Sequence, residues 1–326
     1  MNYKDPHKQI LVQNRSYWDR DETNPWVRAS FLNTLQCRTA AKGGRVFASA
    51  TEQKIFFNPC KSAACSSCGY RAGEKWRAER HAALPNIVYH GMTFSMPDVL
   101  WGIFHDNPRL AKALPTLAAT VIQTRAFLSS GAQAGVVAIL HTFNGKLEFN
   151  SHVHAVVTAG GLRGDSWVSS IYYGRDSLMK GWRKAVIRIL RAALEGGTLQ
   201  TRLTSEQVQI LLGEQESRWW SIRIQTLNSI GQFLQYAGRY IRRPPIAGYR
   251  ITSIGEGIVT FWYNDKREHQ RKYVTCSQEE FIDRWSQHIL QRYQHSVRNF
   301  GLFAPRAVGQ TSRAIFTLLR QKKRRP

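Results

Sequence analysis

The spacing of hydrophobic and polar residues predicts strands and helices that alternate through the middle of the chain. Residues 87–97 have the pattern of a strand, residues 98 to about 129 that of a helix, and residues 135–143 and 146–159 that of two further strands. Asn144 and Gly145 separate these two strands, and an Asn-Gly pair between β-rich runs predicts a hairpin with a two-residue turn. Helices that alternate with antiparallel strands indicate an α+β fold rather than a doubly wound parallel sheet.

The second half of the chain shows the same alternation. A helix is predicted over residues 227–243, with apolar side chains at helical spacing and Pro244 directly after it. A strand follows at 258–265 and a helix at 279–294. The last residues, RQKKRRP at 320–326, form a basic tail, which we expect to be a solvated arm that binds phosphate.

Composition and charge narrow the class of partner. The chain has 326 residues, of which 43% are hydrophobic, so it is long enough for two domains. Lys and Arg number 46 against 22 Asp and Glu, a formal charge of +24, and such an excess points to a polyanion. Nucleic acid is favoured over an anionic membrane because the basic residues are spread along the chain. Without an apolar run of about 18 residues or a signal peptide, we expect a cytoplasmic protein with no membrane partner.

Two histidines on the predicted strand at 146–159 suggest a metal site. His152 and His154 are two residues apart, so their side chains share one face of a strand. With a two-residue turn, His141 and Glu148 lie opposite each other on the same face, which Asn150 also shares. A polar strand face is the alternative. Three histidines beside a carboxylate and an amide favour a divalent-metal site that polarises phosphate.

Two tyrosines suggest a pair of nucleophiles. Tyr236 and Tyr240 are four residues apart on the predicted helix, on a side away from its apolar stripe. Arg239 and Arg243 are expected beside them. Two phenols next to cations that neutralise phosphate are suited to covalent attack on a phosphodiester.

These motifs together resemble a known family. HTFNGKLEFNSHVHAVVTAGGL at 141–162, with FLQYAGRYIRR at 233–243, resembles the two-tyrosine HUH transposases of the insertion-sequence-ninety-one type, where HUH denotes two histidines around a hydrophobic residue. The likeness extends from about residue 30 to about residue 305 and includes MTFSMPDVLW, IVTFWYND and VRNFGLF. It implies an HUH-endonuclease core, an antiparallel sheet flanked by helices, after a small zinc-binding domain. The implied segments are a zinc-binding, DNA-contacting domain at 1–85, a nuclease domain at 86–305 and a basic tail at 306–326.

The resemblance also implies roles for individual residues. His152 and His154 would hold Mg²⁺ or Mn²⁺, with His141 as the third ligand and Glu148 or Gln232 as substitutes. Relatives often have a histidine in place of Asn150, so Asn150 is expected to be a weak ligand or none. The implied nucleophiles attack the scissile phosphate of single-stranded DNA, leaving a 5′-phosphotyrosine and a free 3′-OH; they are Tyr236 and Tyr240. DNA contacts are expected from Arg239, Arg242 and Arg243.

The cysteines predict a structural zinc site. Cys60, Cys65 and Cys68 form the pattern C-x4-C-x2-C, and Cys37 lies 23 residues before it. Tetrahedral zinc needs four such ligands, and scattered buried thiols are the alternative. The family's zinc-binding domain is similar but richer in cysteine, so we expect one Zn²⁺ here. His81 would be a substitute if Cys37 were too distant, and Cys276 is expected to be a small buried hydrophobe.

The sequence therefore favours a transposase that cleaves and joins single-stranded DNA at the ends of a mobile element, by rolling-circle-type transposition. Such a protein would be associated with the nucleoid of a prokaryotic cell. One alternative keeps the chemistry in a plasmid replication initiator or relaxase. Others are a non-catalytic zinc-dependent DNA-binding protein and a zinc hydrolase that uses the three histidines. No nucleotide-binding GxxxxGK[ST] motif is present, and none is needed, because a phosphotyrosine conserves the energy of the broken bond.

Overall fold

The structure is a computed structural model that describes residues 5–62, 64–241, 244–265, 268–289, 295–307 and 310–324. The chain divides into two compact units, each built from segments that are not consecutive in sequence. Unit 1 consists of residues 1–75, 143–149 and 242–294, and unit 2 of residues 76–142, 150–241 and 295–326. These limits do not coincide with the segment boundaries at residues 85 and 305, which stay predictions.

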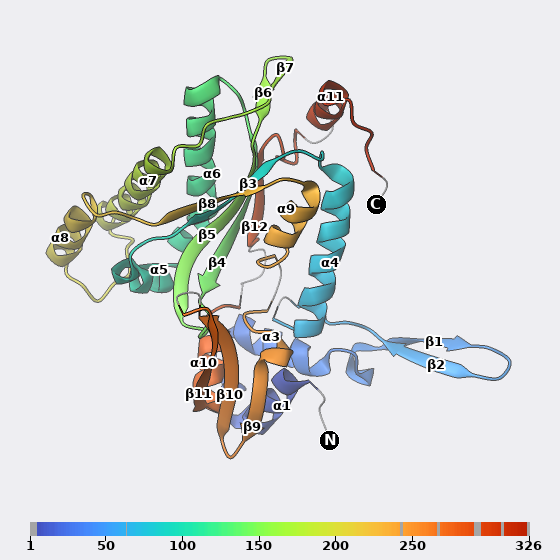
Figure 1. The fold of residues 1–326 in the computed structure, drawn as a ribbon. Helices are drawn as coiled ribbons and strands as arrows, with labels where there is room; N and C mark the ends of the chain where they lie inside the picture. The colour runs from blue at the N-terminus through green and yellow to red at the C-terminus, as the bar shows by residue number, and fades with distance from the viewer. Residues whose placement is uncertain are drawn as a thin grey trace. The chain divides into compact units, whose positions relative to one another are not determined.

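Unit 2 is organised by a five-stranded sheet with the strand order β12, β4, β5, β3, β8 (Figure 1). Its pairings β12 with β4, β5 with β3, and β3 with β8 are antiparallel, which confirms the predicted α+β class. The bounds of the strands are Tyr89–Phe94 for β3, Gly135–Phe143 for β4, Phe149–Thr158 for β5, Ile222–Leu227 for β8 and Val297–Gly301 for β12.

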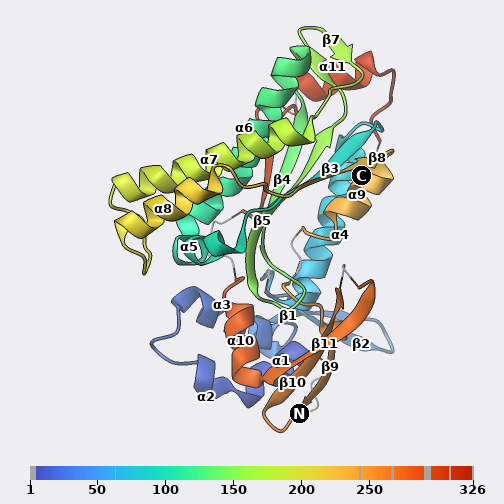
Figure 2. The ribbon, with the colours of Figure 1, turned by 60° about the vertical axis from the view of Figure 1, so that its left-hand side comes forward.

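Helices cover both faces of this sheet (Figures 1 and 2). On one face, Trp182 stacks edge-on against Phe94 with ring centroids 5.4 Å apart. On the other face, Phe233 packs against Tyr89 at 4.9 Å. Because both faces are buried, the central strands are largely apolar. The first face carries α5 (Trp101–Asp106), α6 (Pro108–Ser130) and α7 (Arg175–Glu195), with α8 (Ser205–Gln215) beside α7; the second carries α9 (Ile230–Ala237) and residues 76–83 of α4 (Ser66–Ala83).

Smaller elements complete unit 2. The β6–β7 hairpin and the 3₁₀ turn η2 lie in its connections, and α11 follows the last strand. Ile315 and Phe316 of α11 are buried, and the Arg324 guanidinium donates to the carbonyls of His81 at 2.9 Å and Leu84 at 2.6 Å. Apolar side chains of α11 therefore join the core, whereas Arg320, Lys322 and Lys323 of the basic segment at 320–326 are exposed. The role of that segment as a phosphate-binding arm stays a prediction. The bounds are Gly161–Arg163 for β6, Ser166–Val168 for β7, Asp98–Leu100 for η2 and Gln310–Leu318 for α11.

Unit 1 combines the N-terminal helices with the segment after residue 243. Trp285 packs on Phe31 at 4.9 Å between ring centroids, and Phe31 packs on Trp18 at 5.5 Å. A three-stranded antiparallel sheet, β11-β10-β9, lies against this core. Its elements are α1 (Pro6–Gln13), α2 (Arg15–Trp18), α3 (Pro25–Gln36), η1 (Ala40–Lys42), β1 (Gly44–Ala48), β2 (Gln53–Phe57), the start of α4, η3 (Gly248–Arg250), β9 (Ile251–Gly255), β10 (Ile258–Asp265), β11 (Gln270–Ser277) and α10 (Gln278–Ser286).

The connection between β4 and β5 differs from the predicted two-residue turn. β4 ends at Phe143 and β5 begins at Phe149, so the connection runs from residue 144 to residue 148. The Asn144 side chain accepts from the backbone N–H groups of Lys146 at 2.8 Å and Glu148 at 3.1 Å. Leu147 has a φ of 63° and is fully buried in the core of unit 1. Burial of this leucine and the side-chain cap of Asn144 account for the longer turn.

The predicted helix at 227–243 is much shorter in the structure. Leu227 is the last residue of β8, and the Ser229 hydroxyl begins α9 by accepting from the N–H of Gln232 at 3.2 Å. α9 ends at Ala237, with Gly238 as its C-cap. Pairing of β8 with β3 therefore overrides the helical spacing at the N-terminal end. Across the described residues, no helix is both long and apolar enough to cross a membrane.

We expect Gly91→Ala to destabilise unit 2. A Cβ at Gly91 in β3 would lie 3.0 Å from two carbon atoms of the Tyr236 ring, so the ring or α9 must move. Overpacking of this kind lowers the free energy of unfolding by about 1–3 kcal/mol. Chemical denaturation measures it. Gly102→Ala in α5 is the control, because its Cβ would meet nothing within 4 Å. Equal losses of stability in the two variants would contradict the close fit of Tyr236 against β3.

Candidate active site

The candidate site lies on the face of the unit 2 sheet that α9 covers. β4 carries His141 near its end, and β5 carries His152 and His154. Two-residue alternation on β5 sends Val153 into the opposite layer, where it is fully buried. Thr93 of β3 is the register partner of His154 and shares its face.

Three imidazoles converge at this point. His152 Nε2 lies 3.1 Å from His141 Nδ1 and 3.1 Å from His154 Nε2. One ligand atom from each of the three residues lies within 4.8 Å of the others. The structure thus brings together the three histidines that the sequence placed on one sheet face.

A hydrogen bond indicates which ring nitrogen of His152 carries a proton. His152 Nδ1 lies 2.7 Å from the carbonyl oxygen of Asn150, which can only accept, so the proton is on Nδ1. In the neutral ring of His152, Nε2 is then unprotonated. Its lone pair lies 3.1 Å from Nε2 of His154, an arrangement that a shared cation or proton stabilises. His154 Nδ1 lies 3.3 Å from the Tyr236 hydroxyl, which also donates to the carbonyl of Met92 at 3.1 Å.

These three nitrogens fit a divalent cation. Two ligand atoms bound at right angles about 2.1 Å from one ion lie about 3.0 Å apart, close to the observed spacing. Imidazole suits several transition metals, and second-shell hydrogen bonds to the other ring nitrogen are usual for metal-binding histidines. Thr93 Oγ1, at 3.2 Å from His154 Nδ1, and the Asn150 carbonyl supply such bonds here.

The expected substitute ligands have other contacts. The Glu148 carboxylate accepts from the Asn144 side chain at 2.7 Å, and Glu148 is not part of the three-histidine group. The predicted placement of Glu148 opposite His141 rested on a two-residue turn, which the chain does not have. Gln232 accepts from the N–H of Asn228 at 2.8 Å and so helps to cap α9. Asn150 contributes its backbone carbonyl to His152.

Tyr236 is a buried residue of α9. Only 3% of its surface is exposed, and it belongs to the apolar core. The expectation that it points away from the apolar stripe is therefore wrong, because the sheet face that α9 covers itself carries polar groups. Its hydroxyl lies 3.3 Å from Thr93 Oγ1 as well as from His154. Burial raises the pKa of Tyr236 to about 12, against the opposing effects of the Thr93 hydrogen bond and of Arg239 and Arg223.

Tyr240 lies in the turn that follows α9. Its backbone N–H donates to the carbonyl of Ala237 at 2.9 Å. The half-buried ring stacks on His154 with centroids 3.5 Å apart and planes at 14°, and its centroid is 5.3 Å from that of Tyr236. Burial raises the pKa of Tyr240 too. Both tyrosines of the motif therefore contact the same histidine, from different backbone positions.

Two arginines add positive charge to the site. Arg239 is exposed, and its guanidinium lies 5.2 Å from the centre of the Tyr236 ring and 5.9 Å from that of Tyr240. Arg223 of β8 is the register partner of Thr93, and its charge opposes the rise in the pKa of both tyrosines. The other two predicted DNA contacts lie outside the described residues; they are Arg242 and Arg243.

The sequence did not identify Thr93, Arg223 or Gly91 as part of the site. Thr93 and Gly91 fall within the strand predicted at 87–97, two residues apart, so only their shared face was predictable. Arg223 lies in β8, a strand that the sequence pattern did not predict.

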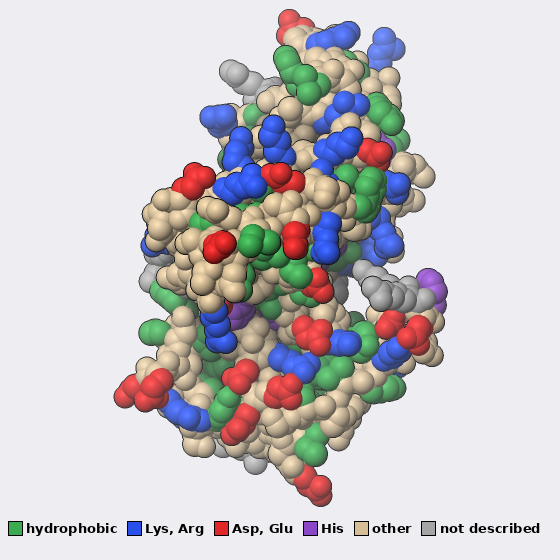
Figure 3. All heavy atoms as spheres, turned by 90° about the vertical axis from the view of Figure 1, so that its left-hand side faces the viewer, with side chains coloured by type: hydrophobic (Ala, Val, Ile, Leu, Met, Phe, Trp, Pro, Cys, Tyr) green, Lys and Arg blue, Asp and Glu red, His purple; other side chains and the backbone are tan. Residues whose placement is uncertain are grey.

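Figure 3 shows further Lys and Arg side chains, with acidic ones between them, over the face of unit 2 that carries α7 and α8.

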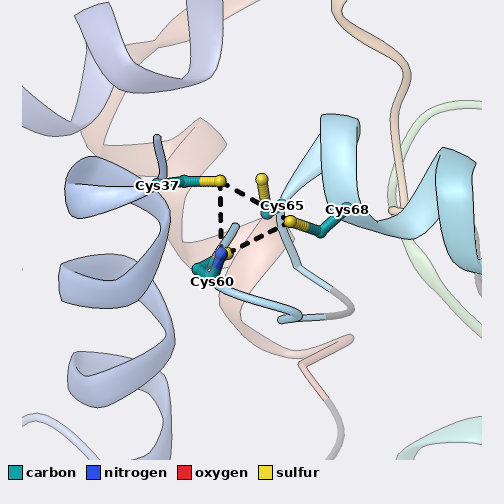
Figure 4. A group of neighbouring side chains, drawn as sticks. All are labelled: Cys37, Cys60, Cys65 and Cys68. Carbon is teal, nitrogen blue, oxygen red and sulfur yellow. Dashed lines mark hydrogen bonds between the residues drawn. The ribbon is translucent and has the colours of Figure 1, made fainter. Parts of the chain in front are cut away.

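Four cysteines form a second cluster in unit 1 (Figure 4). Cys68 Sγ lies 3.5 Å from Cys37 Sγ and 3.6 Å from Cys60 Sγ. Sulfurs bound tetrahedrally about 2.3 Å from one zinc ion are about 3.8 Å apart, so the four thiols fit Zn²⁺. Cys37 caps α3, Cys60 follows β2, and Cys68 lies in the first turn of α4. One metal at this point would hold three separate chain segments together.

The electrostatics of the cluster favour a thiolate at one of its cysteines. The hydrogen bond between Cys60 and Cys65 lowers the pKa of the Cys65 thiol to about 5 and raises that of Cys60, and burial raises the pKa of Cys37. Thiolate is the form that binds metal. His81 is not part of the group, and Cys276 is buried in the apolar core, as expected.

Comparison with known proteins identifies the family. A family described as "Putative transposase" matches residues 135–311, and a "Transposase zinc-binding domain" matches residues 10–96. The chain is a transposase of the insertion-sequence-ninety-one type. The resemblance seen in the sequence is thereby confirmed, including an N-terminal zinc-binding domain that contains the four-cysteine cluster.

Two curated relatives carry corresponding names. The chain is 29% identical over 301 residues to "Transposase for insertion sequence element IS801" of Pseudomonas savastanoi pv. phaseolicola, covering 88% of this chain and 72% of that protein. It is 30% identical over 289 residues to "Putative transposase y4qJ" of Sinorhizobium fredii (strain NBRC 101917 / NGR234), covering 83% and 72%. No solved structure is a significant match. A transposase is an enzyme that acts on DNA, so these findings favour it over the initiator, relaxase and hydrolase alternatives.

We expect Cys68→Ser to remove zinc from the transposase. Loss of one of four thiolates leaves an incomplete tetrahedral site, and metal analysis of purified protein should fall from one zinc per chain to well below one. Cys276→Ser is the matched control, because Cys276 lies outside the cluster. Full zinc content in Cys68→Ser would rule out a four-thiolate site.

Proposed function

We propose that this transposase is an HUH-type, metal-dependent transesterase that cleaves and rejoins single-stranded DNA at the ends of its element. The observation that carries the proposal is the contact of both tyrosines with a histidine of the three-imidazole group. His154 Nδ1 lies 3.3 Å from the Tyr236 hydroxyl, and the Tyr240 ring stacks on the same imidazole. Phenol nucleophiles and metal ligands within one constellation suit attack on a phosphodiester.

The proposed reaction exchanges one phosphodiester for another. A tyrosine oxygen forms a bond to phosphorus, and the bond between phosphorus and the 3′ oxygen breaks. The leaving 3′ oxygen keeps the electron pair and takes up a proton, while the tyrosine gives up its own, so the exchange is balanced in protons. The products are a 5′-phosphotyrosine and a free 3′-OH, so the energy of the bond is conserved and the 3′-OH can reverse the step at another end.

Three residues of the chain would bind the metal, and two others orient the rings of these ligands. His141, His152 and His154 would hold Mg²⁺ or Mn²⁺, which when bound supplies Lewis-acid polarisation of the scissile phosphate. The Asn150 carbonyl and Thr93 keep the rings of His152 and His154 in the ligating orientation.

The tyrosines and arginines complete the proposed site. A phenol with the usual pKa of about 10 is neutral at neutral pH, and burial raises the pKa of both tyrosines further, so the proton must leave as the bond to phosphorus forms. Arg239, beside both rings, and Arg223 would offset phosphate charge. Two tyrosines allow two strands to be held covalently, as rolling-circle-type transposition between two element ends needs. We expect the protein to act in the cytoplasm, in association with the nucleoid.

We expect a covalent complex between the protein and single-stranded DNA that depends on the tyrosines. Labelled DNA from an element end, incubated with the protein and Mn²⁺, should give a slowly migrating adduct on a denaturing gel. The double variant Tyr236→Phe, Tyr240→Phe should give none, because no phenol oxygen remains at the site. Tyr172→Phe, at an exposed tyrosine elsewhere in unit 2, should form the adduct normally. An adduct that survives in the double variant would rule out these nucleophiles.

We expect His152→Ala to abolish Mn²⁺ binding and cleavage but to leave most of the salt-dependent DNA affinity, which comes from Lys and Arg.

Thr93→Val should weaken Mn²⁺ binding about 10- to 100-fold, because it removes a hydrogen-bond partner of His154. Quenching of the free Mn²⁺ signal in electron paramagnetic resonance measures both changes. His105→Ala, at an exposed histidine of α5, is the control. Cleavage that continues in EDTA would contradict the role of the metal.

A further inference from the structure

The outer face of the β9–β11 sheet in unit 1 carries aromatic and cationic side chains. Val259 and Phe261 of β10 are fully buried in the core, so by alternation Thr260, Trp262 and Asn264 face the other way. The antiparallel register pairs Trp262 with Tyr273, and residues directly opposite each other share a face. The same register adds two further partners to this outer face, Thr275 opposite Thr260 and Arg271 opposite Asn264.

The aromatic side chains of this face are open to solvent. Tyr273 is 59% exposed and Tyr249, at the edge of the sheet, 72%. The Trp262 ring is half-buried, with its centroid 5.9 Å from that of Tyr249. The core of unit 1 is closed by the opposite face of the sheet, so packing does not explain three large rings on this side. Neighbouring exposed aromatics are typical of binding surfaces.

Positive charge accompanies the rings. The Arg271 guanidinium lies 4.0 Å from the centre of the Trp262 ring and that of Arg250 5.8 Å from it. None of the described strand positions of this face is acidic: they hold Ser253, Gly255, Ile258, Thr260, Trp262, Asn264, Arg271, Tyr273, Thr275 and Ser277. Asp265, at the end of β10, pairs with Lys272 at 3.6 Å. The face is therefore complementary to an anion that also presents flat apolar surfaces.

We propose that this face binds single-stranded DNA by stacking unpaired bases on Trp262, Tyr273 and Tyr249, with Arg271 beside the backbone phosphates. Aromatic platforms flanked by cations bind single strands with little sequence preference, because every base has a π-face. Duplex DNA offers no free base faces, and the two guanidinium groups beside the Trp262 ring favour an anionic strand over a protein partner. The proposal deepens the proposed function, on which it rests for the single-stranded character of the substrate.

The test compares two oligonucleotides with the full-length chain. Fluorescence anisotropy measures the Kd for a labelled 20-nucleotide thymidine strand and for an abasic strand of the same length. Each stacked base adds about five- to 150-fold in affinity. Tyr273→Ala should therefore weaken binding of the thymidine strand by about five-fold or more and leave the abasic strand unchanged. Tyr273→Phe keeps the ring and should bind like the wild type.

Matched variants separate stacking from charge and from misfolding. Tyr172→Ala removes an exposed tyrosine of unit 2 with Arg125 5.6 Å from its ring, and should not change the Kd for either strand. Arg271→Ala should flatten the dependence of log Kd on log salt by about 0.7, the slope for one single-strand phosphate contact. Trp262→Phe tests the half-buried position without deleting its packing.

The outcomes are distinct from those of the cleavage assay. At saturating DNA, Tyr273→Ala should still form the covalent adduct, because the proposed nucleophiles are elsewhere in the chain. Absence of adduct in the wild type would count against the proposed function, while the anisotropy result would still decide on the platform. An unchanged Kd for thymidine in Tyr273→Ala, or equal losses for both strands, would overturn the platform and favour a protein partner for this face.

Discussion

The antiparallel register of β3 against β5 is the constraint on which the candidate site depends. It places Thr93 directly opposite His154 and leaves Gly91, two residues earlier on the same face, as the space that the Tyr236 ring occupies. A shift by one residue would turn both histidines of β5 into the layer under α6 and α7. Buried imidazoles without partners are costly, so the apolar packing that fixes the register also fixes the chemistry.

The two tyrosines are close in space but differ in environment. Tyr236 is part of a helix and is held by the Met92 carbonyl, Thr93 and His154, which leaves its oxygen defined and poorly hydrated. Tyr240 follows the helix, is half-buried and contacts His154 through its ring face. Gly238, at the C-cap between them, has no Cβ to meet the Leu234 carbonyl, which would lie 2.8 Å from it. A larger residue there would also meet the Arg77 side chain, which lies 3.2 Å from the Cβ position.

The cysteine cluster belongs to a unit that also contains residues 143–149 and 242–294. Its core joins Trp18 and Phe31 from the N-terminal helices to Phe281 and Trp285 from α10. The cysteine cluster ties the end of α3 to the start of α4 within the same unit. Stability of the zinc region and of the β9–β11 sheet is therefore shared, and a change in one is expected to affect the other.

Local pattern determined a large part of this protein. Two-residue alternation placed His152 and His154 on one strand face, the spacing of Cys60, Cys65 and Cys68 indicated metal, and the order of the motifs indicated the family. Local pattern failed where a distant partner decided the outcome. Burial of Leu147 lengthened the turn after Asn144 and removed Glu148 from the metal group. Leu227 pairs with β3 as part of β8 and so does not belong to the predicted helix. Tyr236 and the apolar side chains of α11 are buried in the core of unit 2. Periodicity is a property of neighbouring residues and can be read along the chain, whereas pairing and burial depend on segments that only the folded chain brings into contact.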